Sequence, residues 1–218
     1  MTDESLIREV DEEVRQDEYK KLADRHGSKL MAFIALIVLG VAAFEGWKYY
    51  QRTQSELASV VYLDAVKKAD DGKYDDALAA LAAVKHPGFA QLGKLREAAI
   101  VAVKGDVDKA IADYDAIIAD KATDPVLADL ARIRQGYLLV DTSTPDQLLT
   151  KLGMFDKDGN AWRHAAREIF GLSAYRTKDF TMADRYMNAI FADPDAPQAL
   201  KQRAQVMVQL IAPELVKK

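Results

Sequence analysis

The 218-residue chain contains no cysteine, which excludes thiolate metal sites, cysteine nucleophiles and a disulfide-stapled fold. Its eleven glycines and six prolines are too few for a collagen-like or low-complexity chain. It has no excess of positive charge, since 30 basic residues face 34 acidic ones, so we expect no nucleic-acid partner. Glycine-rich phosphate loops and the nucleophile-elbow pattern of hydrolases are also missing. These absences leave no motif typical of an enzyme.

Metal and cofactor patterns are equally sparse. The three histidines, His26, His86 and His164, lie far apart without metal-ligand spacing, and each is expected to be a surface or turn residue. Residues 156–160 resemble a calcium loop only loosely, because Arg167 stands where such a loop needs its last carboxylate. An ordinary turn is the better interpretation. We therefore expect no enzymatic activity, no cofactor, no metal and no small-molecule substrate.

What the chain does contain is one long apolar run, fifteen residues from Leu30 to Phe44 without a charged side chain. The run is short for a hydrocarbon core of about 30 Å, so its flanks decide the interpretation. Basic residues precede it, and Trp47 and two tyrosines follow it, as at a membrane interface. The sequence predicts a transmembrane signal-anchor helix over residues 30–50. A core helix of a soluble bundle and a cleaved signal peptide are the alternatives.

The basic residues also predict an orientation. Four of them lie just before the run and two just after it: Lys20, Lys21, Arg25 and Lys29, then Lys48 and Arg52. The positive-inside rule places residues 1–29 in the cytoplasm and residues 51–218 on the far side. The tail before the run is acidic, with nine acids and six bases. Its Leu6, Val10 and Val14 are spaced as in a short amphipathic helix, which either binds a partner or is simply solvated.

A short motif recurs after the apolar run. Residues 72–77 (GKYDDA) are matched by residues 105–110 (GDVDKA), 33 positions later, and a third copy at 178–183 (KDFTMA) has lost the glycine. Apolar residues between the copies recur at helical spacing, and no long alternating run indicates strands. A period near 33 residues is typical of stacked helix pairs.

These residues resemble the tetratricopeptide repeat family, a 34-residue pair of helices. The resemblance implies a glycine ending the first helix, a side chain that fills the space between the helices, and an alanine that lets them approach closely. The repeat-signature residues are Gly72, Tyr74, Ala77, Gly105, Val107, Ala110, Phe180 and Ala183. Pro87, Pro125 and Pro194 are expected to end the second helices.

The motif positions define the expected helix pairs. They span residues 55–87, 89–123, 125–153 and 161–194, and an amphipathic capping helix covers 197–212. The fold class is therefore all-α: one N-terminal transmembrane helix, then a tetratricopeptide-like domain of about four helix pairs plus a cap. The third pair lacks the motif, which favours a compact, irregular array. A non-repeating helical bundle is the alternative.

One cluster has the composition of a protein-binding anchor. Trp162, Arg163 and Arg167 lie at a helix start after the irregular loop at 153–160. Exposed Trp and Arg residues often dominate protein interfaces, so these three are candidate partner-binding residues. In the alternative, Trp162 packs under the loop.

The arrangement of acidic tail, single anchor and repeat domain resembles the YfgM-like ancillary subunits of the bacterial SecYEG translocon. That resemblance implies a non-enzymatic protein of the bacterial inner membrane with a periplasmic C-terminal domain. Its implied partners are translocon subunits, periplasmic chaperones and exported chains, whose maturation it assists. A scaffold or adaptor of another cell-envelope complex, without a chaperone role, is the alternative.

Overall fold

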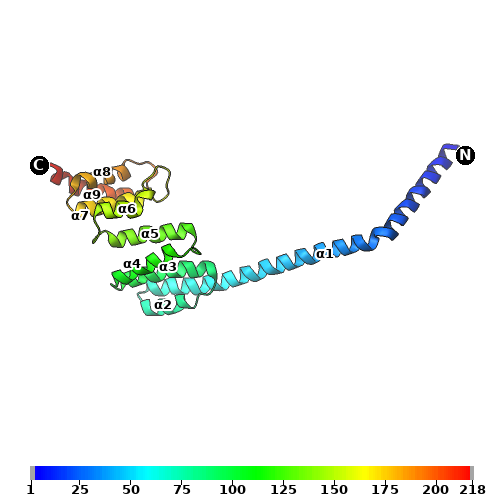
Figure 1. Cartoon of the computed structure of the whole chain (residues 1–218), viewed down its shortest axis with the longest axis horizontal. Helices are drawn as coiled ribbons and strands as arrows, with labels where there is room; N and C mark the ends of the chain where they lie inside the picture. Colours follow the sequence, from blue (N-terminus) through cyan, green and yellow to red (C-terminus); the bar gives the residue numbers. More distant parts are fainter. Residues whose placement is uncertain (1–2, 217–218) are drawn as a thin grey trace. The chain divides into compact units, whose positions relative to one another are not determined.

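The computed structural model describes residues 3–216, with side chains described for residues 26–29 and 31–216. Over residues 3–216 the chain forms nine α-helices, one short 3-10 helix and no strand, which confirms the all-α fold class (Figure 1). The helices are α1 (Asp3–Asp70), α2 (Tyr74–Ala82), α3 (Pro87–Val103), α4 (Val107–Ala119), α5 (Pro125–Leu139), α6 (Pro145–Leu152), α7 (Arg163–Arg176), α8 (Phe180–Phe191) and α9 (Gln198–Val216), with η1 (Gly153–Phe155) after α6. The chain divides into two compact parts, Met1–Leu57 and Ala58–Lys218.

The first part consists of the beginning and middle of α1. The predicted membrane span at 30–50 lies inside this helix, which continues without a break to Asp70. The stripe predicted from Leu6, Val10 and Val14 lies outside the described side chains. A transmembrane boundary at residue 50 stays a prediction.

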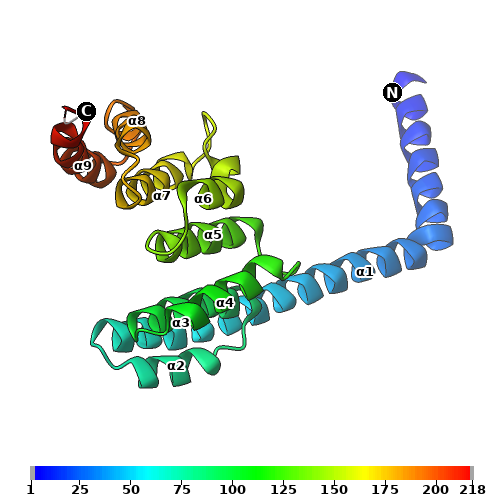
Figure 2. The same ribbon diagram turned by 60° about the vertical axis from the view of Figure 1, so that its left-hand side comes forward.

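The second part is an array of helix pairs. The last turns of α1 pair with α2, then α3 with α4, α5 with α6, and α7 with α8, and α9 closes the array (Figures 1 and 2). The third pair, which lacks the motif, is formed by α5 and α6. Its two prolines, Pro125 and Pro145, lie in the first turns of these helices, where a missing N–H costs nothing.

Each hydrophobic cluster joins one helix pair to the first helix of the next. Ala77 and Leu81 of α2 pack with Ile100 of α3, and Tyr114 of α4 packs with Ala131 of α5. The same pattern continues from α6 to α7 and from α8 to α9. A single pair cannot bury its own apolar face, so stacking supplies the core.

The three motif copies form one type of turn. Gly72 and Gly105 adopt positive φ angles of 78° and 94°, and Lys178 adopts 64° at the matching position. In each copy the next residue donates its N–H to a carbonyl five positions back, for example Lys73 to Lys68 at 2.8 Å and Asp179 to Ala174 at 2.8 Å. This is the Schellman pattern that ends a helix on a left-handed residue.

The prolines act differently from the prediction. Pro87 and Pro125 were expected to end the second helices, but α2 ends at Ala82 and α4 ends at Ala119. Both prolines instead lie in the first turn of the following helix. The fixed φ of proline suits that position, and its missing N–H would have no intrahelical partner there.

Arginines tie each first helix to the one before it. Arg96 of α3 forms an ion pair with Asp70 of α1, and Arg134 of α5 donates to the Leu95 carbonyl of α3 at 3.3 Å. Arg176 of α7 donates to the Val140 carbonyl at the end of α5 at 2.8 Å. Arg203 of α9 pairs with a carboxylate on α7, described below. These links reinforce the apolar stacking along the row of first helices.

Candidate protein-binding groove

The first helices of successive pairs contact one another, α3 with α5, α5 with α7 and α7 with α9. Where α5, α7 and α9 meet, their side chains enclose a groove of about 640 Å³. We call it the α9 groove; it is lined by Tyr137, Glu168, Leu172, Ala199, Gln202, Arg203, Val206 and Met207. Its residues come from three helices that are far apart in sequence, so only the stacked array creates it.

Three linked polar side chains lie in the α9 groove. Arg203 donates to both carboxylate oxygens of Glu168, from Nε to Oε1 at 2.6 Å and from Nη2 to Oε2 at 2.9 Å. The Tyr137 hydroxyl donates to Oε2 as well. The Glu168 side chain is only 5% exposed, whereas that of Arg203 is 56% exposed. Burial, followed by the neighbouring Glu168, raises the pKa of Tyr137, so its hydroxyl stays a donor.

Apolar side chains make up most of the remaining lining. Leu172 of α7 and Met207 of α9 are partly buried, and Val206 of α9 is 55% exposed. Leu210, one turn further along α9, is 51% exposed. A capping helix usually turns a polar face outward, so exposed apolar residues here make this face a candidate binding surface.

Besides a small hollow of about 120 Å³ among α4, α5 and α6, two larger hollows lie elsewhere on the array. One of about 690 Å³ lies between the starts of α3 and α5, where Gln91 bonds the Ala122 carbonyl and the Asp124 N–H. The other, of about 370 Å³, lies among α2, α3 and α4 and is lined by Lys94, Glu97, Lys109 and Asp113 among others. Burial, then the nearby Asp113, raises the pKa of Glu97. The α9 groove differs in holding a buried carboxylate whose two oxygens are both bonded by side chains that line the same groove.

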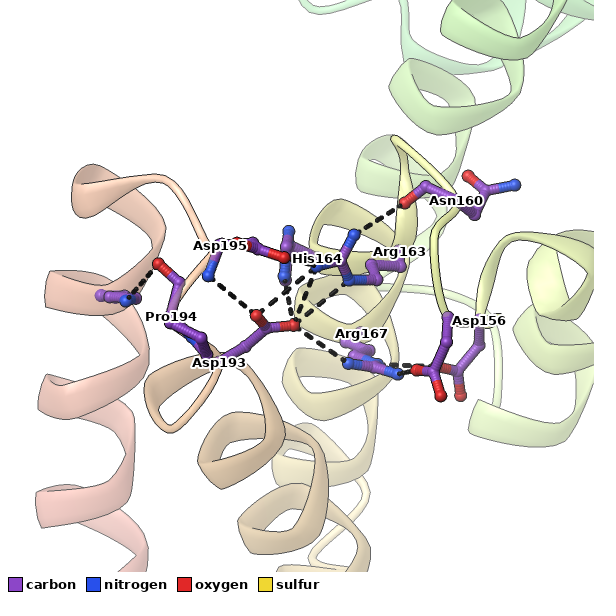
Figure 3. A network of polar contacts seen from close by, with 10 residues as sticks. Asp156, Asn160, Arg163, His164, Arg167, Asp193, Pro194 and Asp195 are labelled. Atoms are coloured by element: carbon purple, nitrogen blue, oxygen red, sulfur yellow. Dashed lines mark hydrogen bonds and ion pairs between the residues drawn. The ribbon is translucent and has the colours of Figure 1, made fainter.

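The predicted partner-binding cluster is engaged inside the domain (Figure 3). Arg163 contacts Asp193 and Asp195, each at 3.2 Å, and Arg167 pairs with Asp156 at 2.7 Å. The arginine side chains are only 13% and 15% exposed. Trp162 packs against the core cluster of α5 to α8. Partner binding by Trp162, Arg163 and Arg167 stays a prediction. The contacts of these residues within the domain give each of them a structural role.

His164 differs from its expected surface position. It is buried, with 5% of its surface exposed, and its Nε2 lies 2.9 Å from Asp193 Oδ2 (Figure 3). The pKa of Asp193 is lowered, first by His164 and then by the Asp195 backbone N–H and Arg163. This network fastens the loop between α8 and α9 to the start of α7. No partner of His164 could be predicted from the sequence, because its acidic partner lies 29 residues away.

The repeat-signature residues have varied environments. Ala77, Ala110 and Ala183 are fully buried, each with an exposed fraction of 0%. Tyr74 and Phe180 pack on the cores of their pairs, whereas Val107 is 37% exposed. Gly72 and Gly105 lie in the turns described above. These residues position the helices and take no part in lining the α9 groove.

Sequence reasoning missed the residues of the groove itself. No sequence motif includes its three polar residues, Tyr137, Glu168 and Arg203. A glutamate in a helix that carries other charged residues is ordinarily predicted to be exposed to solvent. One signal was available, because Val206 and Leu210 add apolar residues outside the buried stripe of α9. Exposed apolar residues on a capping helix indicate a candidate binding surface.

The apolar part of α1 has the properties of a membrane span. The helix from His26 to Asp70 is long and apolar enough to cross a bilayer, the one such helix within the described residues. Every described side chain from Met31 to Tyr50 is exposed. A soluble core helix would bury such residues, so the alternative of a bundle core has no support here.

Metal ligands are not grouped anywhere in the described part of the chain. Within it, no three His, Cys, Asp or Glu side chains lie close enough to hold an ion. Asp156, the first residue of the loosely calcium-like segment, is paired with Arg167 instead.

Comparison with known proteins identifies a family for this chain, but no individual relative. No curated protein and no solved structure matches it. A family model described as a tetratricopeptide repeat-like domain matches residues 20–210. Such domains are typically protein-interaction modules and not enzymes. Since the match covers most of its residues, the chain belongs to the tetratricopeptide repeat-like domain family.

Proposed function

We propose that this protein is a non-enzymatic, membrane-anchored interaction module that binds partner proteins in the α9 groove. The observation that carries the proposal is the groove itself, with exposed apolar side chains on the first-helix side of the array. Arrays of this kind bind partners along the surface formed by successive repeats. Family membership supports protein binding in general.

The membrane anchor determines the compartment in which the α9 groove binds its partners. We place residues 1–29 in the cytoplasm, residues 30–50 in the bacterial inner membrane and residues 51–218 in the periplasm. The exposed apolar side chains of α1 support the span, and the surplus of basic residues before it supports the orientation. The absence of cysteine suits an oxidising compartment.

The partners follow from the resemblance to ancillary translocon subunits. We propose that the module links the SecYEG translocon to periplasmic chaperones and assists the maturation of exported proteins. The acidic tail, single anchor and repeat domain support this assignment. The second candidate is a scaffold of another envelope complex, which the same groove would serve with one fixed partner.

Crosslinking in intact cells, followed by purification of the full chain and mass spectrometry, separates the two candidates. Recovery of translocon subunits together with diverse exported chains would support the first. Recovery of one structural partner in constant ratio would contradict it in favour of the scaffold. If no protein is recovered above an untagged control, the interaction function itself is wrong.

The orientation has a test of its own. A reporter enzyme that is active only after export is fused after Lys218, and the matched control is a reporter active only in the cytoplasm. We expect activity of the exported reporter alone. Activity of the cytoplasmic reporter at that position would overturn the placement of residues 51–218.

A further inference from the structure

We propose that the α9 groove selects uncharged, apolar segments of polypeptide and discriminates against segments that carry charge. This inference rests on the proposed function, because it names the chemistry of the partner that the groove accepts. The argument begins with the two charged side chains that line the groove, Glu168 and Arg203.

These two side chains already neutralise each other's charge. Both carboxylate oxygens of Glu168 accept from Arg203, and one also accepts from Tyr137. If a ligand carboxylate drew Arg203 away, Glu168 would keep a negative charge at 5% exposure without its partner. Leaving one member of a buried pair uncompensated is costly. A ligand carboxylate that leaves the pair intact reaches only guanidinium N–H groups whose charge Glu168 already balances. An acidic ligand therefore gains little from the arginine.

A basic ligand meets the opposite difficulty. The Glu168 oxygens are occupied and buried, so a lysine or arginine entering the groove would find no free carboxylate among its lining residues. It would instead approach the half-exposed guanidinium of Arg203. The basic group would lose hydration without gaining an ion pair, which opposes binding.

The remaining lining favours apolar side chains. Leu172, Ala199, Val206 and Met207 come from α7 and α9, and the thioether of Met207 adapts to ligand side chains of different shape. Gln202 adds a neutral amide able to bond a ligand's backbone. The matching occupant is a stretch of chain with apolar side chains and no charge, as an unfolded protein exposes.

The test measures peptide binding to the full chain in lipid nanodiscs. The probe is a short, end-capped, fluorescent peptide of leucine, valine, serine and glycine, and two matched versions carry aspartates or lysines in place of serines. We expect the uncharged probe to bind at least about tenfold more tightly than either charged version. Its affinity should stay constant or rise up to about 0.5 M sodium chloride. Preference for a charged probe, or an affinity that falls with salt, would overturn the inference.

Variants locate the binding to the α9 groove. Val206→Glu and Ala199→Glu place a carboxylate on exposed positions of α9 that the fold tolerates, and each should weaken the uncharged probe about tenfold. The control is Val126→Glu on α5, where valine is 64% exposed and lines the hollow between α3 and α5 instead of the α9 groove. Its affinity should match the wild type. Equal effects at Val206 and Val126 would contradict the assignment.

A second copy of the chain is the competing occupant. Sedimentation of the full chain in detergent distinguishes it, since we expect the same assembly size for the wild type and Val206→Glu. A smaller assembly in the variant would show that the groove holds a copy of the chain, and the inference would be wrong. The proposed function fails separately, when crosslinking in cells recovers no protein.

Discussion

Two glycines of first helices, Gly136 and Gly171, lie where side chains of other helices pack closely against the backbone. A Cβ at Gly136 of α5 would lie 2.5 Å from Leu152 Cδ1 and 2.9 Å from Ile169 Cδ1. At Gly171 of α7 it would meet only Met187, whose nearest atom is the terminal methyl of an unbranched, flexible side chain. At Gly136 two buried, branched side chains would have to move, so Gly136 is the more demanding position.

We predict that Gly136→Ala lowers the free energy of unfolding by about 1 kcal/mol. Overpacking against two buried side chains costs about 1–3 kcal/mol, which exceeds the gain of about 1 kcal/mol from replacing a helical glycine. The control is Gly93→Ala in α3, where the nearest side-chain atom lies 3.8 Å away. That change should stabilise by about 0.5–1 kcal/mol in denaturant unfolding. Shifts of the same sign in both variants would contradict the packing argument.

The network at Asp193 predicts a pH dependence. Because the folded-state pKa of Asp193 is lowered, its charged form contributes stability above the unfolded value of about 4. That contribution is lost as the pH falls below about 4 toward the lowered folded value. The wild type should therefore unfold at a higher temperature than Asp193→Asn near neutral pH, and the two midpoints should converge in acid.

Asp158→Asn is the control for this pH dependence, since Asp158 is fully exposed and 3.6 Å from Arg167. Its unfolding midpoint should follow the wild type at every pH, as an exposed ion pair contributes little. A constant difference between wild type and Asp193→Asn from neutral pH to about pH 3 would show that Asp193 acts without its charge.

The environments of individual side chains were harder to predict from the sequence than the helices were. The buried alanines Ala77, Ala110 and Ala183 lie where the repeat motif leads one to expect close helix packing. His164 and Glu168 could not be placed, because a charged helix shows no sequence sign of the residue that will cover it. Their partners, Asp193 and Arg203, lie 29 and 35 residues away. Only the stacking of the array brings such residues together.

At the scale of the helix pair, the turn at Lys178 is the weakest of the three motif copies. Lys178 holds the positive φ that Gly72 and Gly105 adopt at the equivalent positions. A left-handed conformation costs a residue with a Cβ about 1–2 kcal/mol, and glycine avoids that cost. The structural context of α7 and α8 therefore imposes strain on one lysine.

We predict that Lys178→Gly raises the free energy of unfolding by about 0.5 kcal/mol. Removing the strain outweighs the larger backbone entropy of glycine in the unfolded chain. Lys73→Gly, in the equivalent turn but at a φ of −85°, is the control and should lower stability instead. Thermal unfolding of the two variants measures the difference. Destabilisation by Lys178→Gly would show that the lysine side chain makes a needed contact.

Helix pairs were predictable because their periodicity is local. The expected third pair at 125–153 matches α5 and α6, although it carries no motif, since prolines and apolar spacing mark both helices. Pro87 and Pro125 were misassigned, because a proline between two helices can follow one or begin the next, whereas Pro194 follows the end of α8 as predicted. The arginine links along α3, α5, α7 and α9 were not predicted, because an arginine in a helix is ordinarily expected to be exposed to solvent without a fixed partner.

At the scale of the whole molecule, one chain combines a helix long and apolar enough to span a membrane with a stacked repeat domain. The apolar part of α1 buries none of its side chains, and its last turns carry Ala65 and Ala69 into the first hydrophobic cluster of the array. The same helix therefore contributes an exposed apolar stretch and, at its end, part of a protein core. Its composition predicted the first feature, and the motif that follows it predicted the second.

The array ends in the α9 groove, the surface on which the proposed function depends. Its preference for apolar partners follows from charges that are internally paired, and its shape follows from three helices that the repeat stacks. Neither property is encoded in one stretch of sequence. Family membership indicates a protein-binding module, and the geometry identifies where on the module binding is expected.

The most direct measurement compares photocrosslinking from single positions of the full chain in its native membrane. A photoreactive residue replaces Gln202 or Val206 in the groove, or Val126 or Phe191 outside it, all of them exposed. Adducts are quantified on gels and identified by mass spectrometry. We predict that protein adducts form at Gln202 and Val206 and are weak or absent at Val126 and Phe191. Equal yields at all four positions, or adducts only outside the groove, would contradict the account.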